Sequence, residues 1–117
     1  MAFSFENLDV YNKAIDFVSS IYSLTKAFPP EEMFGLTSQI RRAAVSIPSN
    51  VSEGSTRSKK DFSRFIDMAR GSVFECVTLL QVSFKQGYIS QKKFADLGNE
   101  LTDLSKMLSG LKRSLNR

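Results

Sequence analysis

The segment QIRRAAVSIPSNVSEG, residues 39–54, decides how the rest of the chain must fold. It joins an apolar helical stripe to an arginine pair, an internal proline and a polar end that finishes in glycine. Ile40, Ala44, Ile47 and Val51 recur at intervals of three and four residues, which is the spacing of one buried helix face. The segment therefore predicts a helix that must satisfy packing and polar contacts together, with other helices placed around it.

The composition bounds the size and the class of the protein. The 117 residues are 42% hydrophobic and 24% charged, as in soluble globular proteins, and they suffice for one hydrophobic core. We therefore predict a single domain over residues 1–117. No apolar run approaches the length of a membrane span, and no signal peptide is indicated. Cys76 has no partner for an intrachain disulfide, which agrees with a reducing compartment, so we expect a cytoplasmic protein without membrane contact.

Charge is distributed unevenly along the chain. Residues 1–40 carry two basic and five acidic side chains, whereas residues 41–117 carry fourteen basic and seven acidic ones. The net charge of the whole chain is +4. This asymmetry indicates either a basic face for an anionic partner or an ordinary solvated surface.

Residues 7–27 are helical by period and carry two neighbouring apolar stripes. The first stripe contains Leu8, Tyr11, Ile15, Val18, Tyr22 and Thr25. The second contains Val10, Ala14, Phe17, Ile21, Leu24 and Phe28. Together they form an apolar arc on the order of 200° wide, which exceeds what one side of a small bundle needs. The arc indicates either a deeply buried helix or a surplus stripe that packs on another subunit, and we favour the subunit contact.

The sequence FPPEE, residues 28–32, separates the first helix from the second. Proline disfavours helix in the preceding residue and fits a first helical turn, and carboxylates complement a helix N-terminus. We therefore expect the second helix to begin directly after this turn, with Met33 as the first member of its apolar stripe. Within that helix Pro48 predicts a kink, and Ser46 and Ser49 are placed to bond backbone groups that the kink exposes.

Ser58 and Asp61 are spaced as a capping box for a third helix. Its buried side is predicted to hold Phe62, Phe65, Ile66, Ala69, Val73, Phe74, Val77, Leu80 and Phe84. Glycine in a helix interior costs about 1 kcal/mol relative to alanine, so Gly71 predicts a close approach by another segment. Gly54 and Gly87 are expected to end the second and third helices as left-handed stops.

Ser90 caps a fourth helix, in which phenylalanine and leucine keep heptad spacing along one narrow seam. The seam consists of Phe94, Leu97, Leu101, Leu104, Leu108, Leu111 and Leu115. After Asp103 the chain has no acid but carries Lys106, Lys112, Arg113 and Arg117. Because three short connections join four helices, we predict an all-α fold, an antiparallel up-down-up-down four-helix bundle.

The residue types exclude several kinds of reaction centre. Without histidine, the chain lacks the Glu-x-x-His ligands of di-metal bundles and the base of a Ser/His or Cys/His pair. Gly54 and Gly71 are isolated, so they do not form a Gly-rich phosphate loop. Cys76 lies among apolar residues, where a small buried hydrophobe is favoured over a reactive thiol. We therefore expect neither an enzyme nor a cofactor.

One set of polar residues is predicted to be structural. Arg41 and Arg42 point about 100° apart on a helix, so they cannot share one environment. Arginine pairs well with carboxylates, and we expect one of the two to pair with a glutamate, inside the protein or across a subunit contact. The other is expected to face solvent. Together with Asn50, Glu53 and Glu75, the two arginines form a predicted structural polar network.

A second set is the candidate for nucleic-acid contact. It lies around the loop before the third helix and on the first turns of that helix: Arg57, Lys59, Lys60, Arg64 and Arg70. Such cations can follow phosphates without reading a base sequence. No aromatic residue interleaves with them on the side predicted to be exposed, so base stacking is not indicated. The alternative interpretation is a solvated helix start.

Motifs over nearly the whole chain carry a family resemblance: FENL (5–8), FP (28–29), GLTSQIRRAA (35–44), SIPSNVSEG (46–54), FSRF (62–65), ARGS (69–72) with Glu75, and GYI (87–89). They resemble the four-helix bundle family of 23S ribosomal RNA intervening-sequence proteins. The resemblance implies an antiparallel bundle that assembles as a ring-shaped homopentamer, without established catalytic residues. That family is also similar to the accessory variability protein of diversity-generating retroelements, which resembles a basic pentameric scaffold binding a reverse transcriptase and nucleic acid.

Two functions follow from these features. The first is a non-enzymatic oligomeric scaffold that associates with ribosomal or other structured RNA through a basic surface, as the net charge of +7 beyond residue 40 indicates. The second is a protein-interaction adaptor whose ring holds a partner enzyme, such as a reverse transcriptase, without direct nucleic-acid contact. The wide apolar arc of the first helix favours this alternative.

Overall fold

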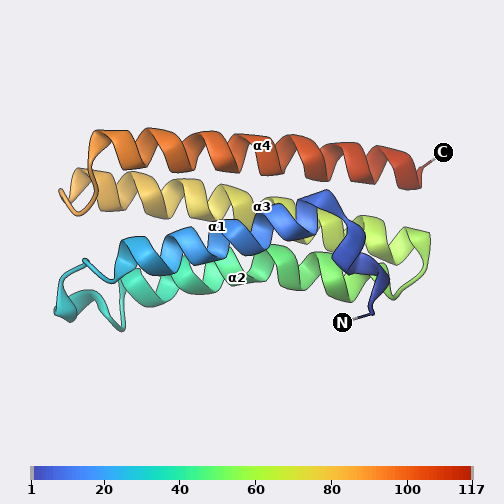
Figure 1. Ribbon diagram of the computed structural model, residues 1–117, viewed down its shortest axis with the longest axis horizontal. Coiled ribbons are helices and arrows are strands. Elements are labelled where there is room, and N and C mark those ends of the chain that lie inside the picture. Colours follow the sequence, from blue (N-terminus) through green and yellow to red (C-terminus); the bar gives the residue numbers. More distant parts are fainter. Residues whose placement is uncertain (1, 117) are drawn as a thin grey trace.

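Four long helices make up the computed structural model, which describes residues 2–116 (Figure 1). They are α1 (Asp9–Thr25), α2 (Leu36–Ser55), α3 (Lys59–Lys85) and α4 (Gln91–Leu115), with the 3₁₀ turns η1 (Ser4–Asn7) and η2 (Pro30–Glu32) before α1 and α2. Consecutive helices run in opposite directions, and the described residues contain no strand. The predicted all-α four-helix bundle is therefore confirmed.

α1 buries its two apolar stripes to different extents. Phe17 and Ile21 of the second stripe are fully buried in the core. In the first stripe, Ile15 is 41% exposed and Tyr22 is 40% exposed. The other apolar members of the first stripe are half-buried against the core, so Ile15 and Tyr22 are the side chains of that stripe that α1 leaves available to another molecule.

The second helix begins later than the sequence predicts. Pro30 starts η2 rather than α2, and Gly35 has a non-helical backbone (φ −114°, ψ −112°) immediately before α2. Met33 therefore lies outside the helix and is 47% exposed. A carboxylate oxygen of Glu32 accepts a hydrogen bond from the Leu36 backbone N–H at 3.2 Å. Glu32 thus satisfies a free backbone amide at the start of α2. It does so from a position before the helix, not from within the first helical turn.

α2 continues through Pro48, which is buried. The Ser46 hydroxyl donates to the Ala43 carbonyl at 2.8 Å, and the Asn50 side-chain amide donates to the Ser46 carbonyl at 2.8 Å. These side chains add local hydrogen bonds in the turns around a proline that lacks its own N–H. The predicted backbone contact of Ser46 is confirmed, whereas the Ser49 hydroxyl makes no such bond within residues 2–116.

Neither Gly54 nor Gly71 has the role that the sequence predicts for it. Gly54 has no left-handed conformation, and α2 runs past it to Ser55. A Cβ atom at Gly54 would lie 2.5 Å from Phe65 Cβ, so this glycine permits the close contact between α2 and α3. No atom lies within 4 Å of the Cβ position of Gly71, so the prediction of a close approach there is wrong within the chain. The left-handed stop at Gly87 is confirmed by its φ of 79°.

α3 presents a narrower buried face than predicted. Phe74 is 56% exposed, because it lies about 100° around the helix from the buried Val73. Cys76 is fully buried, as expected for a small hydrophobe. Burial, with a smaller effect from the neighbouring Glu75 carboxylate, raises the pKa of its thiol to about 12.

α4 closes the core with the predicted seam, of which the fully enclosed members are Leu97, Leu101, Leu104 and Leu108. The Ser58 and Ser90 hydroxyls accept hydrogen bonds from backbone N–H groups three residues later, at 3.2 and 3.1 Å. The predicted serine caps of α3 and α4 are therefore confirmed. Antiparallel packing places the α2–α3 turn and the carboxyl end of α4 at the same end of the bundle (Figure 1).

Candidate nucleic-acid interface

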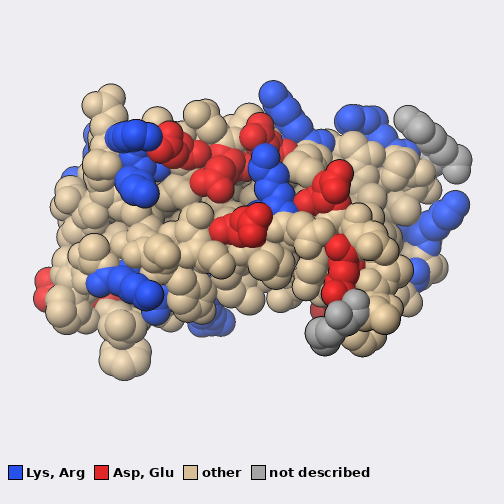
Figure 2. All heavy atoms as spheres, in the orientation of Figure 1, with Lys and Arg blue, Asp and Glu red and all other residues tan. Residues whose placement is uncertain are grey.

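The first turn of α3 presents two accessible lysines among the predicted nucleic-acid contacts. Lys59 and Lys60 are exposed, and no carboxylate pairs with either in the described part of the chain. Figure 2 shows Lys and Arg side chains, with Asp and Glu side chains near them, at the end of the molecule where Figure 1 places the α2–α3 turn. The turn therefore presents ammonium groups to solvent without an internal partner.

Arg57 and Arg64 flank these lysines and pair only with residues close to them in sequence. A nitrogen of Arg57 lies 3.6 Å from a Glu53 oxygen, and its guanidinium stands 5.4 Å from the centre of the Phe65 ring. Arg64 lies 3.4 Å from Asp61, and its side chain is 76% exposed. Exposed ion pairs of this kind contribute about 0–1 kcal/mol, so phosphate can compete with these carboxylates for the two arginines.

Arg70 has a different environment from the other four. Its guanidinium lies 3.5 Å from Asp67, which also receives Lys112 of α4 at 2.8 Å. The hydrogen bond from Lys112 is the main cause that lowers the pKa of the Asp67 carboxyl. The Nε atom of Arg70 is buried without a hydrogen-bond partner. Arg70 is thus half-buried beside Asp67, the residue that links α3 to α4, and is less accessible than the other four cations.

The carboxyl end of α4 adds positive charge that the predicted cluster does not include. Arg113 is exposed and lies at the same end of the bundle as the α2–α3 turn. The acid-free stretch after Asp103 is the sequence signal for this charge, but only antiparallel packing brings it to that end. Arg117 belongs to the same stretch and lies outside the described residues. We call Arg57, Lys59, Lys60, Arg64 and Arg113 the basic end.

Arg41 is the half-buried member of the arginine pair. Its Nε donates to the Thr25 hydroxyl at 2.8 Å, and its guanidinium lies 4.6 Å from the centre of the Tyr22 ring. Its partners are therefore a hydroxyl and an aromatic face of α1, not a glutamate of its own chain. Arg42 is exposed, as expected for the second arginine.

The other members of the predicted polar network lie apart. Asn50 bonds the carbonyl of Ser46, and Glu53 pairs with Arg57. Glu75 is exposed on α3 and borders a shallow hollow together with Arg42. Within residues 2–116, no hydrogen bond or ion pair joins the five predicted residues to one another. Inside one chain they form separate local contacts instead of a single network.

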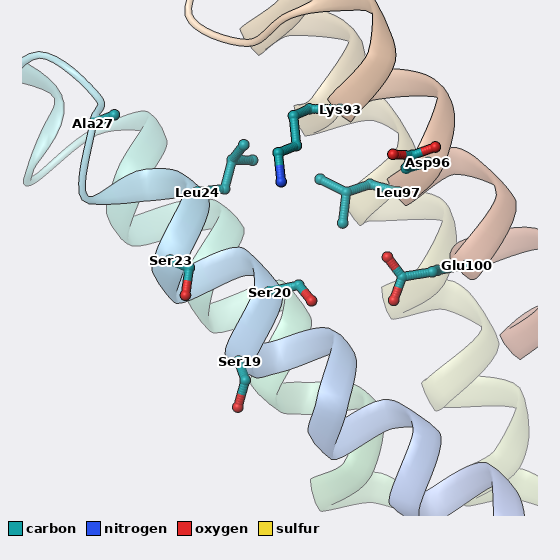
Figure 3. Close-up of a pocket in the computed structure, with 9 residues that line it drawn as sticks. All are labelled: Ser19, Ser20, Ser23, Leu24, Ala27, Lys93, Asp96, Leu97 and Glu100. Carbon is teal, nitrogen blue, oxygen red and sulfur yellow. The ribbon is translucent and has the colours of Figure 1, made fainter.

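A hollow of about 570 Å³ opens between α1 and α4 (Figure 3). Ser20 and Ser23 line it from α1, and Lys93 and Glu100 line it from α4. Burial raises the pKa of the Glu100 carboxyl. These groups suit a small polar molecule, but no hydrogen bond joins a serine hydroxyl to Glu100 in the described range. In the described residues the serines and Glu100 therefore line the hollow as separate polar groups.

Two further features are absent from the described residues. Among residues 2–116, no three His, Cys, Asp or Glu side chains lie close enough together to hold a metal ion. None of the helices in that range combines the length and the apolar character needed to cross a bilayer.

Comparison with known proteins identifies the family. A model of the family described as 23S rRNA-intervening sequence protein matches residues 6–110. A solved structure, a protein of unknown function from the S23 ribosomal protein family of Bacteroides thetaiotaomicron, is similar with a TM-score of 0.81 and 26% identity, covering 88% of this chain and 97% of that chain. No curated protein matches, and neither description names an enzyme. Because the family model spans most of its length, the chain belongs to the 23S rRNA-intervening sequence protein family.

Proposed function

We propose that the protein is a non-enzymatic oligomeric scaffold that associates with structured RNA through the basic end. The observation that carries the proposal is the presence of Lys59 and Lys60, exposed and without carboxylate partners, at the same end of the bundle as Arg113. The family description supports ribosomal RNA as the anionic partner. Assembly into the homopentamer that the family resemblance implies would repeat the basic end once per subunit, and linked patches bind together more tightly than separate ones.

The basic end suits phosphate contacts better than base stacking. Lysine and arginine bind phosphates without reading the sequence of the bases. The Phe65 ring is covered by the Arg57 guanidinium. The exposed Phe74 lies ten positions beyond Arg64, which is about 15 Å along the helix. We therefore expect affinity that depends strongly on salt and weakly on RNA sequence.

A salt titration of binding to a base-paired RNA hairpin tests this function. Native protein is expected to bind at low salt, with log K falling linearly with the logarithm of the salt concentration. Replacement of both Lys59 and Lys60 by Gln is expected to reduce that slope by roughly two units, at about 0.9 per phosphate contact on a duplex.

The matched control replaces Lys26 and Lys93 by Gln. Both lysines are exposed at the opposite end of the bundle, and the change in net charge is the same. The control is expected to keep the native slope. An equal reduction of the salt slope in the two double variants would contradict an RNA contact at the basic end. Failure of native protein to bind the RNA at low salt would also contradict it.

One exposed aromatic side chain favours the adaptor as a second candidate function. Phe34 is 98% exposed beside Met33, in the connection before α2. Large apolar side chains held in solvent are common anchors of protein interfaces. Pull-down with nuclease treatment distinguishes the two functions. An adaptor keeps its protein partner after nuclease and loses it in Phe34→Ser, whereas an RNA-mediated association disappears with the RNA.

A further inference from the structure

An apolar groove runs along the outside of α1 and α2. Two neighbouring hollows between these helices share Val45 and Ser49, and together they extend past Ile15 and Tyr22 of α1. Ile15, Tyr22 and Val45 all remain exposed in the single chain. The groove is the outward stripe of α1 continued across α2, and it leaves a contiguous apolar strip in contact with water.

The outer face of α3 is a second exposed apolar surface. Met68, Phe74 and Val82 stand exposed on it, and Gly71 lies between the first two. Glycine in a helix interior costs about 1 kcal/mol relative to alanine. No atom of the chain lies within 4 Å of the Cβ position of Gly71, so packing inside the chain does not account for it. Close approach by another molecule would account for it.

Arg42 and Glu75 add opposite charges to these two surfaces. Arg42 lines the groove, and Glu75 is the neighbour of Phe74 on α3. Both side chains are exposed, and neither takes part in an ion pair among residues 2–116, although both border the hollow between α2 and α3. Each copy of the chain therefore carries an arginine and a carboxylate that a second copy can complement.

We propose that the α1–α2 groove of one copy binds the outer face of α3 of a second copy, with Arg42 of one opposite Glu75 of the other. The proposal rests on the oligomer in the proposed function and names the surfaces that form it. Apolar side chains supply the buried area, and the charge pair sets the alignment and excludes wrong pairings. Because the two surfaces differ, each added copy presents a free groove or a free α3 face to the next.

Charge reversal at the two positions tests the contact. Arg42→Glu and Glu75→Arg are each expected to reduce the mass measured by sedimentation, because like charges then meet at every contact. A 1:1 mixture of the two variants is expected to recover the association, because opposite charges again face each other between unlike copies. Mixing cannot restore a pair that forms within one chain, so recovery identifies the contact as one between copies.

Lys106→Glu is the matched control, because Lys106 is exposed on α4, which carries neither surface. It is expected to keep the native mass, and far-UV circular dichroism shows that each variant is folded. Val45→Ser, in the middle of the groove, is expected to weaken association without any change of charge. A native chain that sediments as a monomer at about 50 µM, single reversals that keep the native mass, or a mixture no larger than its components would each overturn the proposal.

This readout is independent of RNA binding. Sedimentation is measured without RNA, and Arg42 and Glu75 lie outside the basic end. If native protein assembles but binds no RNA, the proposed RNA function fails and the contact between copies stands. If the reversals leave the mass unchanged while salt-dependent RNA binding persists, the contact fails and the RNA function stands.

Discussion

At the scale of single residues, Gly54 determines how closely α2 approaches α3. A Cβ atom there would lie 2.5 Å from Phe65 Cβ and 2.9 Å from Phe62 Cδ1. The Cβ atom of Phe65 cannot rotate away, so the helices themselves would have to separate. Farther along the same contact the hydroxyls of Ser46 and Ser72 are hydrogen-bonded. Small side chains therefore keep these two helices in close contact.

Gly54→Ala is expected to destabilise the protein by about 1–3 kcal/mol, the usual cost of overpacking a core. Gly98→Ala is the control, since Gly98 lies inside α4 and no atom lies within 4 Å of its Cβ position. Alanine there is expected to stabilise by up to about 1 kcal/mol, because it favours helix. Urea denaturation measures both. Equal effects of the same sign would contradict the role assigned to Gly54.

At the scale of elements, Glu32 connects two turns at one end of the bundle. One of its carboxylate oxygens accepts the Leu36 backbone N–H at the start of α2, and the other accepts the Tyr88 hydroxyl at 3.0 Å. The Tyr88 ring also packs on Phe28, with ring centres 5.4 Å apart. These contacts attach the connection before α2 to the turn between α3 and α4. Phe34 belongs to the same connection and is exposed to solvent.

Glu32→Ala is expected to lower the pKa of Tyr88. The hydrogen bond to Glu32 is the main cause that raises this pKa above its usual value of 10.0. The contribution of the bond to folding is present below pH 10 and is lost as the pH rises through the higher folded-state value. Ultraviolet titration of the tyrosines measures the change.

The same variant is also expected to lose about 1 kcal/mol of stability at neutral pH, as when a helix cap is removed. Glu31→Ala is the control, because the exposed Glu31 side chain makes no hydrogen bond within the described residues and raises the pKa of Tyr88 only through its charge, which is the smallest of the causes. An unchanged tyrosine titration in Glu32→Ala would contradict the connection through Tyr88.

At the scale of the whole molecule, ion pairs at the surface join helices that also pack together through the hydrophobic core. Asp67 of α3 receives Lys112 of α4 at 2.8 Å, near the basic end. Asp103 of α4 lies 3.3 Å from Lys13 of α1. These side chains are partly exposed, so salt screens the pairs and each contributes modestly.

Asp67 is expected to make part of the stability of the bundle depend on pH. Its folded-state pKa is lowered from 3.8, so its contribution is fully present above that value and is lost as the pH falls through the lower folded-state pKa. Asp67→Asn should therefore be less stable than native protein at pH 7, and the difference should shrink as the pH falls below 3.8. Urea unfolding across this range measures the difference. Asp16→Asn, at an exposed carboxylate without an ion pair in the described chain, is expected to lack this pattern.

Features that depend on neighbours along the chain could be predicted without the structure. The second stripe of α1 is buried as expected at Phe17 and Ile21. The caps at Ser58 and Ser90 and the stop at Gly87 form at the predicted positions. In the same way, the position of Lys59 and Lys60 in the first turn of α3 follows from the cap before them. Helical period and capping are local, because each involves residues within about one turn.

Features that depend on how two helices meet could not be predicted in this way. Periodicity gives the side of a helix that a residue occupies, but not the separation and rotation of neighbouring helix axes. Tertiary packing therefore assigned the close contact to Gly54 rather than Gly71, left Phe74 exposed, and half-buried Arg70 beside Asp67, which also receives Lys112 of α4. It also brought Arg113 to the end that carries the α2–α3 turn, because antiparallel helices join residues that are distant in the chain. Residues 39–54 thus dictate a buried helix with a proline inside it, whereas the positions of α1 and α3 against that helix determine the contacts of Arg41, Ser46 and Gly54.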